Sequence, residues 1–139
     1  MVKSILSSPQ ESVLTQALSA SSLRHKVLSN NIANVNTPGF KRSDVVFEDK
    51  LAAAMSGSGR PRLEMTRTNE RHLPGRGSEG FGPSITTDTM TSLRTDDNNV
   101  DIDAEMANVA KNTLYYEAVA QQLGRYFTNL KSAISEGKR

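Results

Sequence analysis

The sequence predicts a mainly α-helical protein in which two long terminal helices pair as an antiparallel, coiled-coil-like hairpin, joined by a short, irregular and partly flexible middle segment with some β-structure. Near both ends of the chain, apolar residues recur in alternating steps of four and three, a pattern typical of helices packed against helices. Between them, glycine, proline, serine and threonine dominate. The predicted divisions are residues 1–40, 41–99 and 100–139, with the two helices forming one core domain.

Composition limits the size of the core and the kinds of chemistry. Of the 139 residues, 36% are hydrophobic and 5% aromatic, so a large compact core is not expected. The net charge of +2 arises from 17 basic and 15 acidic residues, which does not indicate a nucleic-acid-binding surface. Without cysteine, disulfides and thiolate metal sites are excluded. Neither a cleaved signal peptide nor a transmembrane span is predicted.

The first helix is predicted between about Gln10 and Asn36. Its apolar stripe is narrow and is interrupted by Ser21 and His25, so we expect it to need a partner along its length. The stripe consists of Leu14, Leu18, Ser21, His25, Leu28, Ile32 and Val35.

This helix stops in the stretch Ser29 to Phe40, Ser-Asn-Asn-Ile-Ala-Asn-Val-Asn-Thr-Pro-Gly-Phe. Thr37 precedes a proline and is disfavoured in the α region, and Gly39 can take the positive φ of a Pro-Gly turn. Asparagine amides both donate and accept, so we expect the row of them to bond neighbouring helices and specify register. The candidate interface residues are Asn30, Asn31, Ile32, Asn34, Asn36, Thr37, Pro38, Gly39 and Phe40.

The middle segment is predicted to hold little regular structure. Asp44 to Phe47 is predicted as a short extended segment, Glu48 to Met55 as about two helical turns and Leu63 to Thr68 as a candidate strand. Between Ser56 and Asn99 a loop with little core-forming capacity is otherwise expected, ordered by neighbouring molecules if at all.

The last helix carries the strongest periodic signal. Asp101 and Asp103 stand at its start, where carboxylates cap free N–H groups and meet the positive end of the helix dipole. Its stripe is Ile102, Met106, Val109, Thr113, Tyr116, Ala120, Leu123, Phe127, Leu130 and Ile134. The candidate helix seam comprises Leu14, Leu18, Leu28, Met106, Val109, Tyr116, Leu123, Phe127, Leu130 and Ile134.

Two apparent ligand motifs fail on their context. The run from Gly75 to Gly80 matches the dinucleotide-binding glycine pattern, but Pro74 replaces the preceding strand and no helix is predicted to follow. The alternating acids and amides from Asp97 to Asp103 imitate a calcium loop, but the positions that require glycine and a bidentate glutamate hold other residues.

No pattern supports catalysis either. The two histidines are far apart, and neither a nucleophile elbow nor a phosphate-binding loop is present. We therefore expect no enzymatic activity, no cofactor and no metal site.

The stretch from Ser29 to Phe40 resembles the amino-terminal signature of the flagellar rod, hook and hook-associated axial proteins. The short length, the continuation from Lys41 to Asp49, and Asn98-Asn-Val-Asp-Ile-Asp-Ala-Glu105 resemble the B-type proximal rod members of that family. The C-type members are the alternative, but they usually carry an insertion after the asparagine motif and a different opening to the last helix. The resemblance covers both helices and the motif, roughly half the chain. Departures from the commoner alanine, alanine and tyrosine occur at Ser29, Val35 and Phe40.

The resemblance implies a structural subunit that polymerises helically in the proximal rod of the bacterial flagellar basal body. Such a subunit joins the MS ring and export apparatus to the rest of the rod and transmits torque. It is exported through the flagellar type III channel without a cleaved signal peptide and lies outside the inner membrane. The implied partners are further copies of the chain, other rod proteins, the basal-body adaptor protein at the rod base, the MS ring and the export gate. The resemblance implies neither nucleic acid nor a membrane span.

A soluble helical adaptor or secretion chaperone is the alternative from a different class. Such a protein is expected to be a stable helical dimer at low concentration, whereas a rod subunit is expected to be monomeric before it assembles.

Overall fold

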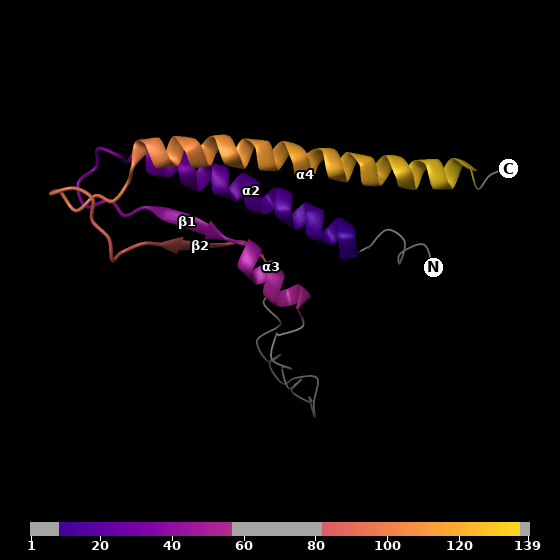
Figure 1. Ribbon diagram of the computed structural model, residues 1–139, viewed down its shortest axis with the longest axis horizontal. Helices are drawn as coiled ribbons and strands as arrows, with labels where there is room; N and C mark the ends of the chain where they lie inside the picture. The colour runs from indigo at the N-terminus through magenta and orange to yellow at the C-terminus, as the bar shows by residue number, and fades with distance from the viewer. Residues whose placement is uncertain (1–8, 57–81, 137–139) are drawn as a thin grey trace, which may run out of the picture.

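The computed structural model describes residues 9–56 and 82–136. Its elements, in chain order, are α2 (Pro9–Ala33), β1 (Ser43–Val46), α3 (Glu48–Met55), β2 (Ser84–Thr87) and α4 (Ile102–Glu136). Helices α2 and α4 lie side by side and antiparallel, and β1 lies between α2 and β2 (Figure 1). The predicted mainly helical fold with two paired terminal helices is confirmed.

The limits of the two long helices follow from local chemistry. Pro9 opens α2, where its fixed φ suits the first helical turn. Helix α2 ends at Ala33, three residues before the predicted limit, because Asn34 to Asn36 continue as turns. The carboxylate of Asp101 accepts hydrogen bonds from the backbone N–H of Asp103 (3.0 Å) and Ala104 (3.4 Å), so the predicted cap at Asp101 is confirmed.

The two strands form an antiparallel pair. Their register joins Ser43 to Thr87, Asp44 to Thr86, Val45 to Ile85 and Val46 to Ser84. The extended segment predicted from Asp44 to Phe47 is present as β1, which begins and ends one residue earlier, and the short helix from Glu48 to Met55 is present as predicted. The expectation of an unbroken loop before Asn99 is wrong for β2, which is held by pairing with a strand about forty residues earlier in the chain. The candidate strand at Leu63–Thr68 and the glycine pattern at Gly75–Gly80 lie outside the described residues.

The hydrophobic core is small and lies where β1, α3, α2 and α4 meet. Phe47 is fully buried against Ala17 and Ala20, with Leu51 and Val119 packed at the edge of this cluster. The small alanine side chains leave room for the phenylalanine ring, whose burial contributes about 1.5–3 kcal/mol. The other buried hydrophobic residues are Val27, Leu28, Val45 and Val100.

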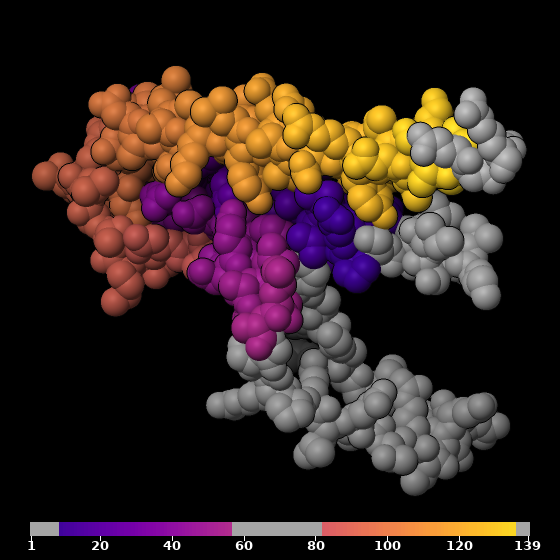
Figure 2. All heavy atoms as spheres, turned by 45° about the vertical axis from the view of Figure 1, so that its right-hand side comes forward, coloured from indigo at the N-terminus to yellow at the C-terminus, as the bar shows by residue number. Residues whose placement is uncertain are grey.

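Helix α4 is the longest element and runs along one side of the molecule (Figure 2). It has 35 residues against 25 in α2, and its C-terminal part extends beyond the start of α2 (Figure 1). Ten additional residues correspond to about 15 Å of helix. In residues 9–56 and 82–136, no helix is long and apolar enough to cross a membrane.

Candidate functional site

The asparagine stretch lies at a buried polar junction between α2, β1 and the start of α4. Asn31 is fully buried, and its amide nitrogen donates to the carbonyl oxygen of Ser43 (2.8 Å) and to Oε2 of Glu105 (2.9 Å). Its amide oxygen accepts the backbone N–H of Ser43 at 3.1 Å. Because Asn31 satisfies both backbone groups of Ser43, it replaces a neighbouring strand at this edge of β1 and fixes α2 against it.

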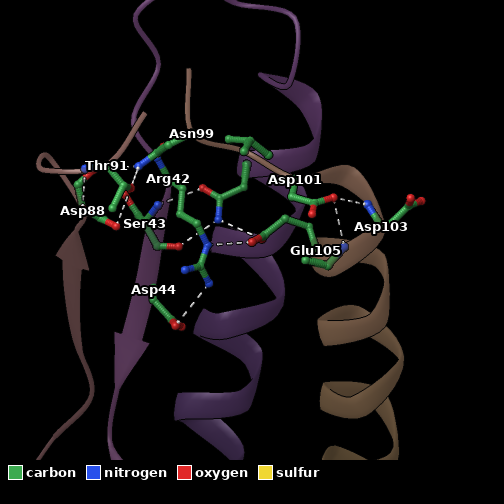
Figure 3. A network of polar contacts seen from close by, with 12 residues as sticks. Arg42, Ser43, Asp44, Asp88, Thr91, Asn99, Asp101, Asp103 and Glu105 are labelled. Atoms are coloured by element: carbon green, nitrogen blue, oxygen red, sulfur yellow. Dashed lines mark hydrogen bonds and ion pairs between the residues drawn. The ribbon is translucent and has the colours of Figure 1, made fainter. Parts of the chain in front are cut away.

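Glu105 and Arg42 supply the charges of this junction (Figure 3). The fully buried carboxylate of Glu105 accepts from Nε of Arg42 at 2.8 Å as well as from Asn31. This hydrogen bond is the main cause that raises the pKa of the Arg42 guanidinium. The backbone N–H of Arg42 also donates to the side-chain oxygen of Asn99 (2.6 Å), whose amide donates to the carbonyl of Asp88 (3.0 Å). The junction therefore connects Arg42, just before β1, and Asp88, just after β2, to the start of α4.

Asn98 determines the path of the chain after α2. Its side chain is fully buried, and its amide donates to the carbonyl oxygens of Asn34 (3.0 Å), Val35 (3.1 Å) and Thr37 (2.8 Å). These carbonyls belong to the end of a helix and the turns after it, where backbone acceptors lack partners within the helix. The conformation of this stretch is thus set by a residue more than sixty positions later.

Gly39 has the positive φ expected from the Pro-Gly turn, at 71°. Its backbone N–H donates to the carbonyl oxygen of Asp96 at 2.8 Å, which closes the turn against the segment before α4. L-residues rarely adopt this backbone angle, apart from asparagine and aspartate, so glycine is the residue best suited to it.

The other candidate interface residues divide between internal contacts and the surface. The amide of Asn34 donates to the carbonyl of Asn30 (2.8 Å) and its oxygen accepts from the Thr37 hydroxyl (3.2 Å), both within the motif. Ile32 and Phe40 are partly buried. The exposed members are Asn30, Asn36, Thr37, Pro38 and Gly39. Contacts of the amides with other subunits stay a prediction, and Asn31 and Asn34 already bond within the chain.

A second buried polar contact joins α2 to α4. The Ser21 hydroxyl donates to Oδ1 of Asn112 at 2.9 Å, and the Asn112 amide donates to the carbonyl of Ser21 at 3.0 Å. Asn112 lies one heptad after Glu105, so both face α2 from the same side of α4. Buried polar pairs of this kind specify helix register.

The candidate seam residues do not all lie between the two helices. Leu28 is buried, and Leu14, Leu18, Val109, Leu123 and Leu130 are partly buried. Tyr116, at 45% exposure, borders a groove between α2 and α4. Met106, Phe127 and Ile134 are 57%, 47% and 62% exposed. Their positions follow a spacing of seven or its multiples, and we call the row of Met106, Thr113, Ala120, Phe127 and Ile134 the outer row.

All members of the outer row except the partly buried Ala120 are exposed, because the stripe of α4 that faces α2 is centred on Glu105 and Asn112, one position before Met106 and Thr113. A hydrophobic pattern cannot identify a contact stripe with a carboxylate and an amide at its centre. Sequence analysis therefore missed Arg42, Asn98, Asn99, Glu105 and Asn112 as contributors to the fold of this region.

An ion pair one heptad before Asn31, on the same face of α2, anchors α3. The guanidinium of Arg24 contacts both carboxylate oxygens of Glu48, at 2.9 and 2.7 Å, and also donates to the carbonyl of Val45 at 2.9 Å. The hydrogen bond from Arg24 is the main cause that lowers the pKa of the Glu48 carboxyl. The adjoining cleft of about 590 Å³ has side chains of both charges, including Lys111 and Asp49.

The described residues form no cluster of three or more histidines, cysteines or acids that could bind a metal ion. His25 is exposed on α2 and borders the groove beside Tyr116. Two of the residues that imitate a calcium loop have structural contacts instead: Asp101 caps α4, and Asn99 bonds Arg42, Asp88 and Thr91.

Comparison with known proteins gives a consistent result. A family model described as "Flagella basal body rod protein" matches residues 12–41, which span most of α2 and the asparagine stretch. The chain is 35% identical over 125 residues to the flagellar basal body rod protein FlgB of Bacillus subtilis (strain 168), which covers 90% of this chain and 92% of the relative. Identity to the FlgB of Borrelia hermsii is 38% over 116 residues, covering 81% and 86% of the two chains. The FlgB of Proteus mirabilis (strain HI4320) is 30% identical over 124 residues, covering 88% and 90%.

Proposed function

The chain belongs to the family of flagellar basal body rod proteins, of the FlgB type, and from this membership we infer that it is a structural subunit of the proximal rod of the bacterial flagellar basal body. It functions there together with other rod components. The observation that carries this inference is the match to a FlgB relative over about nine-tenths of both chains.

The outer row of α4 is the surface that we propose for contact with neighbouring subunits. A helix with exposed Met106, Phe127 and Ile134 on one side has apolar area to bury against another chain. Burying each such side chain contributes about 1.5–3 kcal/mol before the cost of association. The exposed asparagines of the motif, Asn30 and Asn36, lie near the end of the hairpin where the outer row begins, and they are proposed as polar contacts in the same assembly.

The finer features of assembly are also part of the proposal. Residues 1–40 and 100–139 form the axial core, and residues 41–99 form the segment between its two helices. Copies of the chain polymerise helically and contact other rod proteins, the basal-body adaptor protein, the MS ring and the export gate, so that torque passes through them. The subunit reaches this place through the flagellar export channel without a cleaved signal peptide. We assign it no catalytic role.

The experiment replaces outer-row residues in a strain that lacks its own copy of the gene. Phe127→Ser and Ile134→Ser should leave the free energy of unfolding of the isolated chain within about 0.5 kcal/mol, because both side chains are exposed. Both should abolish swimming and leave basal bodies without a rod in electron micrographs. Leu114→Ser is the matched control, since Leu114 is 69% exposed on α4 but lies outside the outer row.

Four results would count against the proposal. Normal rods in both outer-row variants would contradict the assembly role of this surface. An equal loss of swimming and of rods in the Leu114→Ser strain would show that the outer row does not differ from other exposed positions of α4. A normal rod in the strain without the gene would contradict the rod function itself. A stable dimer of the isolated chain in sedimentation experiments would favour the adaptor or chaperone alternative.

A further inference from the structure

Strand β2 has one paired and one open edge. The backbone N–H of Asp88 donates to the carbonyl of Arg42 at 2.9 Å, which places residues 42 and 88 as a hydrogen-bonded pair in the antiparallel ladder. Because such pairs alternate, the backbone groups of Thr86 also point toward β1, whereas those of Ile85 and Thr87 point away from it. In the part of the chain that the structure describes, these outward N–H and C=O groups have no partner.

The opposite edge of the sheet is treated differently. On β1, Asn31 satisfies the outward N–H and C=O of Ser43, and Arg24 donates to the outward carbonyl of Val45. Side chains of α2 therefore cover the edge of β1 and prevent another strand from pairing there. Residues 43 and 45 are the register partners of residues 87 and 85. Because the backbone groups of 43 and 45 point away from β2, those of 87 and 85 are expected to point away from β1.

Strand β2 lacks the features that usually protect an exposed edge. Its sequence, Ser84-Ile-Thr-Thr87, has no charged residue and no proline, and three of its four residues are β-branched. Ile85 is 54% exposed. A two-stranded sheet is marginal alone, so a third strand would add stability as well as backbone hydrogen bonds.

A side-chain cavity lies between α2 and the strand pair, and Ile85 is the residue of β2 that lines it. It has a volume of about 250 Å³, and Ile85 and Ser43 line it together with Leu23, Val27, Lys26 and Asn30 of α2. A strand placed next to β2 would present every second side chain to this side of the sheet. The cavity would take an apolar side chain opposite Ile85, and Lys26 at its border favours an acidic residue nearby.

We propose that β2 receives an extended segment of a different basal body protein by β-strand addition, with an apolar side chain of that segment in the cavity beside Ile85. This inference rests on the proposed rod function. A second copy of the chain fits less well through its own β2, which among the described strands has the sole open edge. Pairing of β2 with β2 would be two-fold symmetric and would close at a dimer, whereas a rod grows head to tail.

The test compares two proline variants at adjacent positions in the full chain. Thr87→Pro removes an outward N–H and leaves the ladder intact, so the isolated chain should keep the circular dichroism spectrum of the wild type. Thr86→Pro removes an N–H that bonds to β1 and should disrupt the sheet. We expect Thr87→Pro to abolish swimming although the protein folds and is exported. Wild-type swimming in this variant would overturn strand addition.

A photocrosslinking residue at position 85 gives an independent measurement that does not depend on the fold of a proline variant. In assembled basal bodies, it should form an adduct with an identified basal body protein, mapped to one extended segment, and Thr87→Pro should abolish this adduct. Adducts with further copies of this chain alone, or an adduct unaffected by Thr87→Pro, would overturn the proposal. If deleting the gene prevents rod formation and these results are still negative, the rod function stands and strand addition fails.

Discussion

Nε of Arg42 lies 2.8 Å from Oε1 of Glu105, and this contact pairs a side chain with 31% exposure with one that is completely buried. The pair connects the residue before β1 to the first turn of α4, 63 positions later in the chain. If its counter-charge is removed, a buried carboxylate still carries the cost of its removal from water. Substitution of Arg42 and substitution of Glu105 should therefore differ in their effect on stability.

Arg42→Met should therefore lower the free energy of unfolding by about 3 kcal/mol, because it leaves the Glu105 carboxylate buried and without a cation. The Arg42→Met/Glu105→Met double variant should recover part of this loss, and the coupling energy should be about 1–3 kcal/mol. Urea unfolding followed by circular dichroism measures both quantities. Arg125→Met, at an exposed position of α4, is the control and should change stability by less than about 0.5 kcal/mol. Additive effects of the two substitutions would show that the pair is not coupled.

Asn98→Ala should destabilise the chain by about 2–4 kcal/mol, because three carbonyl oxygens at the end of α2 lose their donor in a buried place. Asn34→Ala is the comparison, since Asn34 loses two local hydrogen bonds at a partly exposed site and should cost less than about 1 kcal/mol. Hydrogen exchange of the amides in residues 30–40 would localise the effect. Equal losses in the two variants would contradict the role given to Asn98.

Gly39→Val should weaken the turn after α2 by about 1–2 kcal/mol through backbone strain, since valine is disfavoured at a φ of 71°. A Cβ atom at this position would meet no atom within 4 Å, so backbone strain is the main expected cost. We expect Gly39→Asn to be milder, because asparagine tolerates positive φ. Swimming assays should show loss of motility for Gly39→Val with export retained. A Gly39→Asn strain as impaired as Gly39→Val would point to a contact surface at Gly39 rather than to its backbone angle.

The Arg24–Glu48 pair gives a dependence on pH. The pKa of Glu48 is below its ordinary value of 4.5, so the folded state favours the ionised carboxylate, and its stabilising contribution is fully present above that value. The contribution is lost as the pH falls through the lower, folded-state pKa. The difference in unfolding free energy between the wild type and Glu48→Gln should therefore be constant above pH 4.5 and shrink below it. The pKa of Asp88 is also lowered, mainly by the Thr91 hydroxyl, but Asp88 titrates alike in both proteins. A constant difference down to acid pH would exclude the ion pair as the cause.

Local sequence signals predicted the elements whose structure depends on nearby residues. The segment before Phe47 and the helix from Glu48 to Met55 follow from residue preferences and short-range pattern, and the α4 start follows from the carboxylate of Asp101. The Pro-Gly turn followed from backbone sterics, and Gly39 has the expected positive φ.

Contacts between distant residues could not be predicted in the same way. Strand β2 has four residues and depends on its pairing with β1, so its own sequence gives little signal. The stripe of α4 that contacts α2 contains Glu105 and Asn112, which a search for apolar periodicity assigns to the surface. The asparagines of the motif were expected to bond other subunits, but the partners of Asn31 inside the chain become visible only once the β1 edge is in place.

The junction around Asn31 also affects when the protein can fold. Its partners are Ser43 and Glu105, and the second polar contact joins Ser21 to Asn112, so the closing contacts span 74 and 91 positions. Such high contact order means that loop-closure entropy is lost before the contacts stabilise the fold. A chain that emerges from a narrow passage with its N-terminus first would remain incomplete until the beginning of α4, up to Asn112, has followed. Folding of this subunit is thus delayed until about four-fifths of the chain has arrived.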